Sequence, residues 1–192
     1  MKRISVPVIV LLVCAASVAA AYGQQHPTTS STQTSTSPPD ASRDATREKV
    51  RAVLTAMGPK INVEFKPGDG QPYNFVGVMK TGLKNTDSLE IVISVTAQET
   101  IHFRIYPHYN GSYINVNKAK DVSELARKML RFGDSNFLYW GADASYDVFA
   151  GYNFTLESGF PEASFRVVLG SIANLDEYVR QLRPAIDGTT AP

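Results

Sequence analysis

The chain has 192 residues, of which 19 are basic and 18 are acidic, so its net charge at neutral pH is +1. Proteins that bind nucleic acids or anionic lipid surfaces depend on a surplus of basic side chains that neutralise phosphates. Because this chain has no such surplus, its composition argues against both kinds of partner.

The first 23 residues have the three parts of a secretory signal peptide. Lys2 and Arg3 supply a basic start, residues 4–18 form an almost unbroken apolar run, and residues 19–23 are mostly small. The apolar run is shorter than the roughly 20 residues that a membrane-spanning helix needs. We therefore predict cleavage after Gly23, export to the periplasm or the medium, and no stable membrane span.

Cleavage at this point would remove the chain's only cysteine, Cys14, so the mature protein would hold no thiol for a disulfide, a metal site or catalysis. It would also remove two basic residues and no acidic one, which changes the net charge to −1. The alternative is that Cys14 is the lipidated residue of a lipoprotein. Val13 precedes it, whereas a small residue normally precedes such a cysteine.

The rest of the chain divides into a linker, one domain and a short tail. Residues 24–46 are rich in Ser, Thr and Pro and contain no large apolar side chain, so they cannot offset the entropy of ordering. We predict that they are disordered, apart from a helix start at their end. Residues 47–187 mix apolar and polar side chains and suit a single compact domain, and residues 188–192 are predicted to be a disordered tail.

The first half of the domain is predicted to be a helix followed by strands. Apolar residues recur at helical spacing from Ser42, a candidate cap, to Met57, and Gly58-Pro59 is a stop signal. Alternation of apolar and polar residues predicts strands with short links, which favours an antiparallel meander with a tight turn at Asn110-Gly111. The predicted strands span residues 61–65, 73–80, 88–96, 100–106 and 113–116.

The second half is predicted to contain two helices that flank a β-hairpin. Asp121 and Glu124 form the pattern of a capped helix start, and Gly133-Asp134 ends that helix. The last helix opens at Pro161 and closes near Pro184 and Gly188. The hairpin strands span residues 136–140 and 146–155. The order helix, strands, helix, two strands, helix predicts an α+β fold with three helices segregated from a mostly antiparallel sheet.

This order resembles the YbjN family of bacterial proteins described as sensory-transduction regulators. The resemblance rests on a short helix ending in residues 128–132 (KMLRF), aromatic strands at residues 137–140 (FLYW) and 148–152 (VFAGY), and a long last helix. It implies the fold of the small chaperones of type III secretion systems, which cradle extended partner peptides and often dimerise. It implies no catalytic residue and no cofactor.

Histidines offer weak candidates for chemistry. His26 lies in the predicted linker, and His102 and His108 lie around a strand expected to end near Pro107. Zinc requires three or four convergent ligands, and no third ligand lies at useful spacing from this pair. A hydrolase would need a nucleophile beside one of them, and the chain contains no Gly-x-Ser-x-Gly motif.

Carboxylates and glycine-rich turns also favour structural roles. Asp143 suits a turn, Asp147 suits the polar face of a strand, and Gly68-Asp69-Gly70 lacks the glycine spacing and the following helix of a phosphate-binding loop. We therefore assign no catalytic, metal-ligating or cofactor-binding residue and predict that the protein is not an enzyme.

Both faces of the predicted aromatic hairpin are partly apolar. Either helices cover both faces, or one face is exposed and contacts a partner or a second copy of the chain. Strand residues around His102 offer a further polar and aromatic face for peptide or protein contact. The candidate partner-contact residues are His102, Arg104, Tyr106, Phe137, Tyr139 and Phe149.

The sequence thus predicts an exported, non-enzymatic protein-interaction module of the YbjN type, chaperone-like or regulatory. Its predicted partner is a protein or peptide of unknown identity, with a homodimer left open, and not a nucleic acid. Two alternatives remain: an exported small hydrolase that uses His102 or His108, and a carrier of a small ligand in a pocket between helix and sheet.

Overall fold

The structure is a computed structural model that describes residues 39–98 and 100–189. The predicted signal peptide, most of the predicted linker and residues 190–192 of the predicted tail lie outside these ranges. Within the described ranges, no helix is long and apolar enough to cross a membrane.

The described residues confirm the predicted α+β class. The helices are α1 (Pro39–Met57), α2 (Val122–Ser135), α3 (Glu162–Ser171) and α4 (Leu175–Asp187), with short 3-10 helices η1 (Gly58–Ile61), η2 (Val116–Lys118) and η3 (Ile172–Asn174). The strands are β1 (Phe65–Gly68), β2 (Gln71–Met79), β3 (Ser88–Val95), β4 (Thr100–Tyr109), β5 (Ser112–Tyr113), β6 (Tyr139–Ala142) and β7 (Val148–Thr155).

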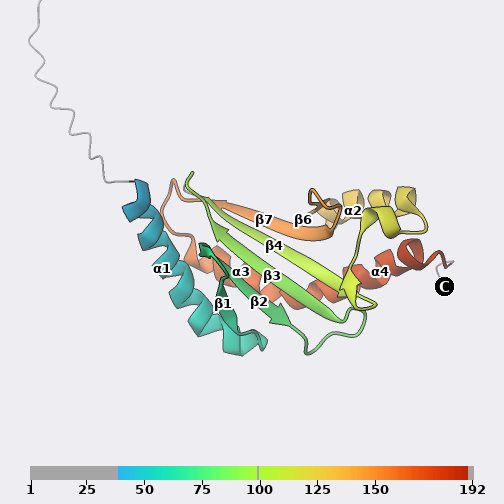
Figure 1. The fold of residues 1–192 in the computed structure, drawn as a ribbon, viewed down its shortest axis with the longest axis horizontal. Helices are drawn as coiled ribbons and strands as arrows, with labels where there is room; N and C mark the ends of the chain where they lie inside the picture. The colour runs from blue at the N-terminus through green and yellow to red at the C-terminus, as the bar shows by residue number, and fades with distance from the viewer. Residues whose placement is uncertain (1–38, 99, 190–192) are drawn as a thin grey trace, which may run out of the picture. The chain divides into compact units, whose positions relative to one another are not determined.

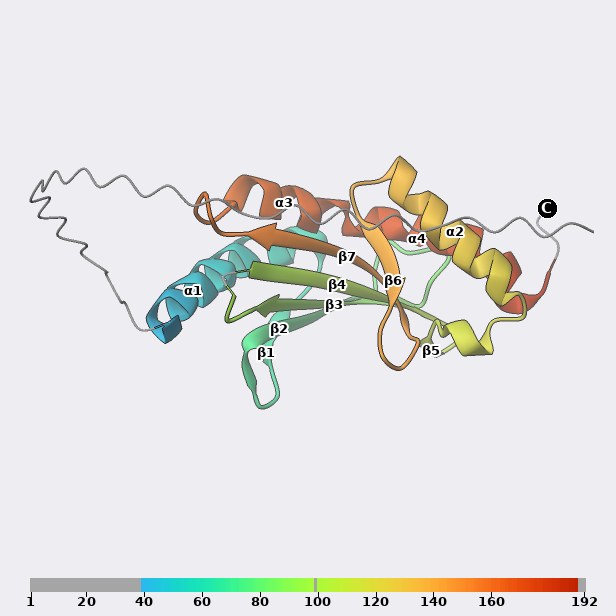
Figure 2. The same cartoon turned by 90° about the horizontal axis from the view of Figure 1, so that it is seen from above.

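All strand pairs are antiparallel. The order across the sheet is β1-β2-β3-β4-β7-β6, with β5 paired to β4 beyond the end of β7. In Figure 1 the sheet faces the viewer and α3 and α4 lie behind it. Figure 2 shows α2, α3 and α4 on that same side of the sheet. The helices therefore form one layer and the sheet forms the other.

Strand alternation places the core between these two layers. Ile91 and Ile93 of β3 and Phe103 of β4 are fully buried. The Phe103 ring packs edge-on against Phe165 of α3, with ring centroids 4.7 Å apart. Burying each large apolar side chain contributes about 1.5–3 kcal/mol, so this face of the central strands is the main source of stability.

Local signals correctly predict one helix cap and one tight turn. The Asp121 carboxylate accepts a hydrogen bond from the Glu124 backbone N–H at 2.8 Å, which confirms the predicted cap of α2. Asn110 and Gly111 have φ values of 54° and 76°. Positive φ at both central residues is required by the tight hairpin turn that Asn-Gly predicts.

Helix α1 begins at Pro39, before the predicted cap Ser42 and before the predicted domain start at residue 47. The early turns are held by the sheet. The Arg43 guanidinium donates two hydrogen bonds to the Val95 carbonyl, at 2.8 and 3.0 Å, and lies 3.5 Å from the centre of the Tyr73 ring. Because the hydrogen bonds to Val95 span 52 residues, local sequence patterns do not predict them.

The strand predicted at residues 61–65 is wrong in position. The chain continues beyond Gly58-Pro59 as η1, Asn62 adopts a left-handed conformation, and β1 begins only at Phe65. The Val63 N–H donates to the Gly58 carbonyl at 2.9 Å, so this hydrogen bond belongs to the turn. The apolar alternation that predicted a strand here reflects packing of the turn on the sheet.

Strand β4 continues through Pro107 to Tyr109, although it was predicted to end near the proline. Proline lacks the N–H that a ladder position normally uses. Pairing of β4 with β7 stops at Ile105, and the Pro107 carbonyl on that side accepts a hydrogen bond from Ile114. The missing donor therefore leaves no β7 acceptor unpaired.

The predicted long last helix is divided into α3 and α4 by η3. Pro184 lies inside α4 instead of ending it, and Gly188 caps the helix with φ 72°. Carbonyls in the last turn of α4 accept hydrogen bonds from the backbone N–H groups of Lys120 and Asp121. The C-terminal end of α4 is thus fixed to the start of α2.

Candidate functional site

The face of the sheet opposite the helices carries the candidate site, and we call it the open face. In Figure 2 no helix of the described ranges covers it. Its side chains follow from strand register: Arg104 of β4 lies opposite Val92 of β3 and Gly151 of β7. Its residues include Val76, Val78, Glu90, Val92, His102, Arg104, Tyr106, His108, Tyr113, Tyr139, Phe149 and Asn153.

Four aromatic rings form a continuous row across the open face. Tyr113 contacts Tyr106, and Tyr106 contacts Phe149, each with ring centroids 5.7 Å apart. Phe149 then contacts Tyr139 with centroids 5.9 Å apart. The row connects β5, β4, β7 and β6, so it depends on the order of strands in the sheet.

Two glycines bring this row close to the backbone. The Tyr139 ring lies over Gly151, where a Cβ would come within 2.5 Å of the ring. The Phe149 ring lies over Gly141, where a Cβ would approach to 3.3 Å. Aromatic rings stacked over strand glycines supply the packing that the missing side chains cannot.

Exposure differs along the row. Phe149 is only 6% exposed although no helix lies over it, because Arg104 and the neighbouring rings surround it. The Arg104 guanidinium lies 4.8 Å from the centre of the Phe149 ring. Tyr113 and Tyr139, at the two ends, are 36% and 41% exposed. The centre of the row is therefore shielded from solvent, and the tyrosines at its two ends are accessible.

Polar side chains surround the end of the aromatic row at β5. The Tyr113 hydroxyl donates to Glu90 Oε2 at 2.9 Å, and His108 Nε2 lies 3.5 Å from the same oxygen. Burial raises the pKa of the Tyr113 hydroxyl to about 12, and its hydrogen bond to Glu90 acts in the same direction. Tyr113 is therefore a neutral hydrogen-bond donor at physiological pH.

His102 lies near the other end of β4. Its Nε2 is 3.1 Å from Thr100 Oγ1, and this hydroxyl also contacts Thr96. Burial lowers the pKa of His102 below 6.5, and the charge of Arg104 adds to the effect. His102 is thus uncharged at neutral pH.

The structure brings five of the six predicted contact residues together on the open face and leaves out Phe137. Phe137 precedes β6, and its ring packs against Tyr152, whose side chain lies on the helix side of the sheet next to Phe154. The predicted strand at residues 136–140 would place Phe137 on the same face of the hairpin as Tyr139. That prediction is wrong because β6 begins only at Tyr139.

Sequence reasoning missed Tyr113 and Glu90 as members of this surface. The alternation pattern predicts a strand at Tyr113 but does not specify its neighbours, because these depend on the pairing of β5 with β4. Glu90 shares a strand face with Val92, and this alternation is the signal that could have found it.

The described ranges contain no cluster of side chains suited to a metal ion. No group of three or more His, Cys, Asp and Glu side chains there could hold a metal ion. His108 Nε2 is buried and makes no hydrogen bond in that part of the chain. Asp143 accepts hydrogen bonds from the backbone N–H groups of Ser145 and Asp147, which confirms its predicted role in a turn.

Comparisons with known proteins find little similarity. No protein-family model and no curated protein matches the chain. Among solved structures, a chain of the ExsC–ExsE complex matches with a TM-score of 0.42 and 12% sequence identity, over 71% of this chain and 94% of that chain. A similarity at this level assigns neither a family nor a function.

Proposed function

We propose that this protein is a non-enzymatic protein-interaction module of the YbjN type that works outside the cytoplasm. The observation that carries the proposal is the continuous row of aromatic rings on the open face, which no described helix covers. The YbjN assignment rests on the order of helices and strands and on the aromatic hairpin. Its role would be chaperone-like or regulatory.

The chemistry of the open face suits a protein or peptide partner. Tyrosine and arginine are enriched where a few residues carry most of the binding energy of an interface. Here Tyr139 and Tyr113 offer accessible rings with polar ends, and Arg104 is already packed over Phe149. Polar groups at the β5 end would form the rim of such an interface.

Side-chain order on this face favours binding without large rearrangement. Ring contacts and the Tyr113–Glu90 hydrogen bond hold the aromatic row in place before a partner arrives. A surface fixed in this way loses little side-chain entropy on association. The partner is a different protein, a peptide or a second copy of the chain.

Photocrosslinking tests the proposal. The amino acid p-benzoylphenylalanine replaces Tyr113 or Tyr139 on the open face, or Leu130 or Val167, which are 80% and 62% exposed on the helices. After irradiation of cells that produce the full chain, adducts are expected from the two tyrosine positions only. Mass spectrometry of the adducts, with light scattering of the purified protein, distinguishes a second copy from another protein.

Two results would contradict this proposal. One is a complete lack of adducts at Tyr113 and Tyr139. The other is equal adduct formation at Leu130 and Val167, which would show that the open face is not the preferred contact surface. Neither substituted tyrosine lies in the buried core, so both variants are expected to fold.

The proposed location has its own test. Residues 1–23 have the pattern of a signal peptide. We expect the protein from the periplasmic or extracellular fraction to begin at Gln24, as measured by intact mass and N-terminal sequencing. Protein that stays in the cytosolic fraction with Met1 or residue 2 at its start would contradict export.

A further inference from the structure

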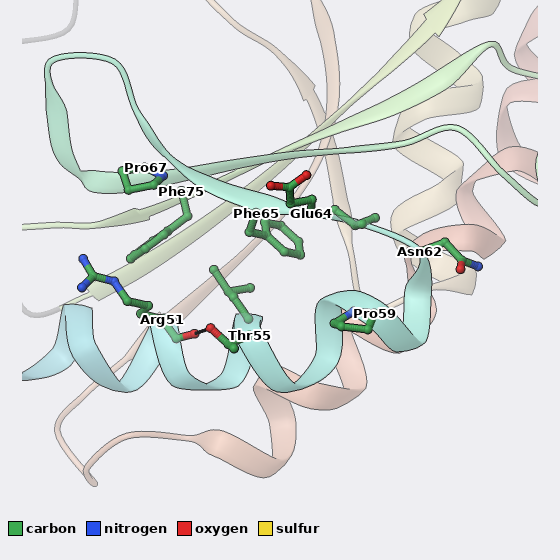
Figure 3. Close-up of a pocket in the computed structure, with 10 residues that line it drawn as sticks. Arg51, Thr55, Pro59, Asn62, Glu64, Phe65, Pro67 and Phe75 are labelled. Carbon is green, nitrogen blue, oxygen red and sulfur yellow. Dashed lines mark hydrogen bonds between the residues drawn. The ribbon is translucent and has the colours of Figure 1, made fainter.

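A cavity of about 560 Å³ lies between α1 and the hairpin of β1 and β2, at the opposite edge of the sheet from β6 (Figure 3). Leu54, Val63, Phe65 and Phe75 give it an apolar lining. Cavities of roughly 300–1,000 Å³ with such linings are typical of sites for small molecules. This cavity is separate from the open face.

The turn from α1 into β1 shapes the cavity. Asn62 reverses the chain with φ 55°, and Val63 and Phe65 then lie over Gly77 of β2. A Cβ on Gly77 would come within 2.5 Å of Val63 and 2.7 Å of Phe65. Both side chains therefore rest against the sheet and form one wall, while Leu54 and Thr55 of α1 form the other.

The charge that faces this cavity is positive. Arg51 extends from α1 toward Phe75, and its guanidinium carbon lies 6.0 Å from the centre of that ring (Figure 3). The carboxylate of Glu64 points away from α1 and pairs with Lys66 at 3.3 Å. The end of the cavity near Arg51 thus suits a negatively charged group.

Arg51 keeps donors for such a group. A guanidinium carries five N–H donors, and the hydrogen bond from Arg51 to Glu48 uses only Nη1, at 3.1 Å. The Arg51 and Glu48 side chains are 49% and 50% exposed. Exposed ion pairs of this kind contribute little, so a ligand anion can replace Glu48 without a large cost.

We propose that this cavity binds a small amphipathic molecule with an apolar body and a single anionic head, such as a medium-chain carboxylate. The body lies against Leu54, Phe65 and Phe75, and the head pairs with Arg51. The proposal does not depend on the proposed function, because none of these residues belongs to the open face.

The segment that directly precedes α1 is a poor occupant of the cavity. Residues 24–38, which directly precede α1, consist of Gln, His, Pro, Thr and Ser and contain no large apolar side chain. A segment of this composition gains little from burial in an apolar cavity. A small apolar anion matches both the lining and the charge.

Binding of octanoate to the full chain tests the proposal, with octanol as the matched neutral probe. Octanoate is expected to bind saturably and to shift the backbone amide resonances of Thr55, Val63 and Phe65. Octanol is expected to bind about threefold more weakly, because it cannot form the charge-assisted hydrogen bond to the half-exposed Arg51. Equal affinities, or shifts that map to the open face, would overturn the proposal.

Two substitutions test separately how the anionic head and the apolar body of the ligand contribute to its affinity. Arg51→Gln should weaken octanoate binding about threefold and leave octanol binding unchanged. Thr55→Trp, at an exposed position on the wall formed by α1, should fill the cavity and abolish both. The matched controls are Arg131→Gln and Leu130→Trp, at exposed positions of α2.

Wild-type affinity in the Thr55→Trp protein would overturn the proposal. The proposal would also be overturned if Thr55→Trp changed the molar mass measured by light scattering and left the ligand affinity unchanged. The cavity would then be an interface between copies of the chain. Circular dichroism verifies that each variant is folded. The shifts mapped on the unmodified protein keep the test decisive if a variant fails to fold.

Discussion

The carboxylate of Asp176, in the first turn of α4, accepts hydrogen bonds from both the backbone N–H and the side-chain amide of Asn85, each at 2.8 Å. The backbone N–H groups of Lys84 and Thr86 also donate to it, at 2.9 and 3.0 Å. Asp176 is only 7% exposed. One buried carboxylate thus fixes the loop between β2 and β3 to the helix layer.

Replacing Asp176 with alanine should destabilise the protein by about 3 kcal/mol, because the backbone donors of the loop lose their acceptor in a buried site. Urea denaturation is expected to show a lower midpoint with an unchanged slope. Asp134→Ala, at an exposed position of α2, is the matched control and should change stability by less than about 0.5 kcal/mol. Equal midpoints for the two variants would show that the Asp176 contacts contribute nothing.

Gly151→Ala should move the Tyr139 ring, because the added Cβ would come within 2.5 Å of it. We expect a loss of about 1 kcal/mol in the free energy of unfolding. We also expect weaker photocrosslinking from p-benzoylphenylalanine placed at position 113. In a Tyr139→Ser background the same change should stabilise the protein by about 0.5 kcal/mol, since alanine is better than glycine in a strand. A cost that is the same in both backgrounds would contradict the ring contact.

Stability should fall on acidification because of His102. Burial and Arg104 lower its pKa below the value of 6.5 expected for the unfolded chain. Between the folded and the unfolded pKa, the unfolded state binds more protons, so the free energy of unfolding rises with pH and is lost as pH falls below 6.5. Urea titrations at several pH values should show a shallower acid loss for His102→Gln than for the unmodified protein.

Arg104→Gln is a second check on this pH dependence. It removes one of the two causes of the lowered pKa but leaves burial in place. The acid loss should therefore become smaller without disappearing. An unchanged profile for both variants would mean that the pH dependence arises elsewhere.

Replacing His102 and His108 together with alanine should have no effect on any hydrolysis detected in a broad ester and amide screen. A catalytic histidine needs a nucleophile on one nitrogen and an orienting acid on the other. Within the described ranges, His102 has a hydroxyl partner in Thr100 but no hydrogen-bonded carboxylate, and His108 Nε2 makes no hydrogen bond and lies 3.5 Å from Glu90. Hydrolysis that is lost in the double variant would instead support the hydrolase alternative.

Much of the fold follows from local patterns. Strand β3 matches its predicted range to within one residue, and the Asp121 cap and the Asn110-Gly111 turn lie where they were expected. These features depend on interactions within a few residues, or on an alternation that every residue of the strand repeats. Such signals can be recognised without knowledge of the rest of the structure.

Contacts between distant segments decided the features that sequence reasoning placed wrongly. The early start of α1 depends on Arg43 and Val95, and β4 passes through Pro107 because β7 stops pairing at Ile105. Phe137 lies outside the candidate site because β6 begins three residues later than expected. Each of these outcomes is set by a partner that lies far away in the chain.

By itself, the sequence determined the α+β class, the strand faces of β3 and β4, and the near-neutral charge of the chain, because alternation and composition are properties of the local sequence. Only the tertiary structure decided that helices cover one face of the aromatic hairpin, that Tyr113 joins Tyr106 and Phe149, and that a cavity lies beside α1. These three results require strands and helices to be placed against one another. That placement depends on side-chain packing between segments, which the order of residues along one strand does not specify.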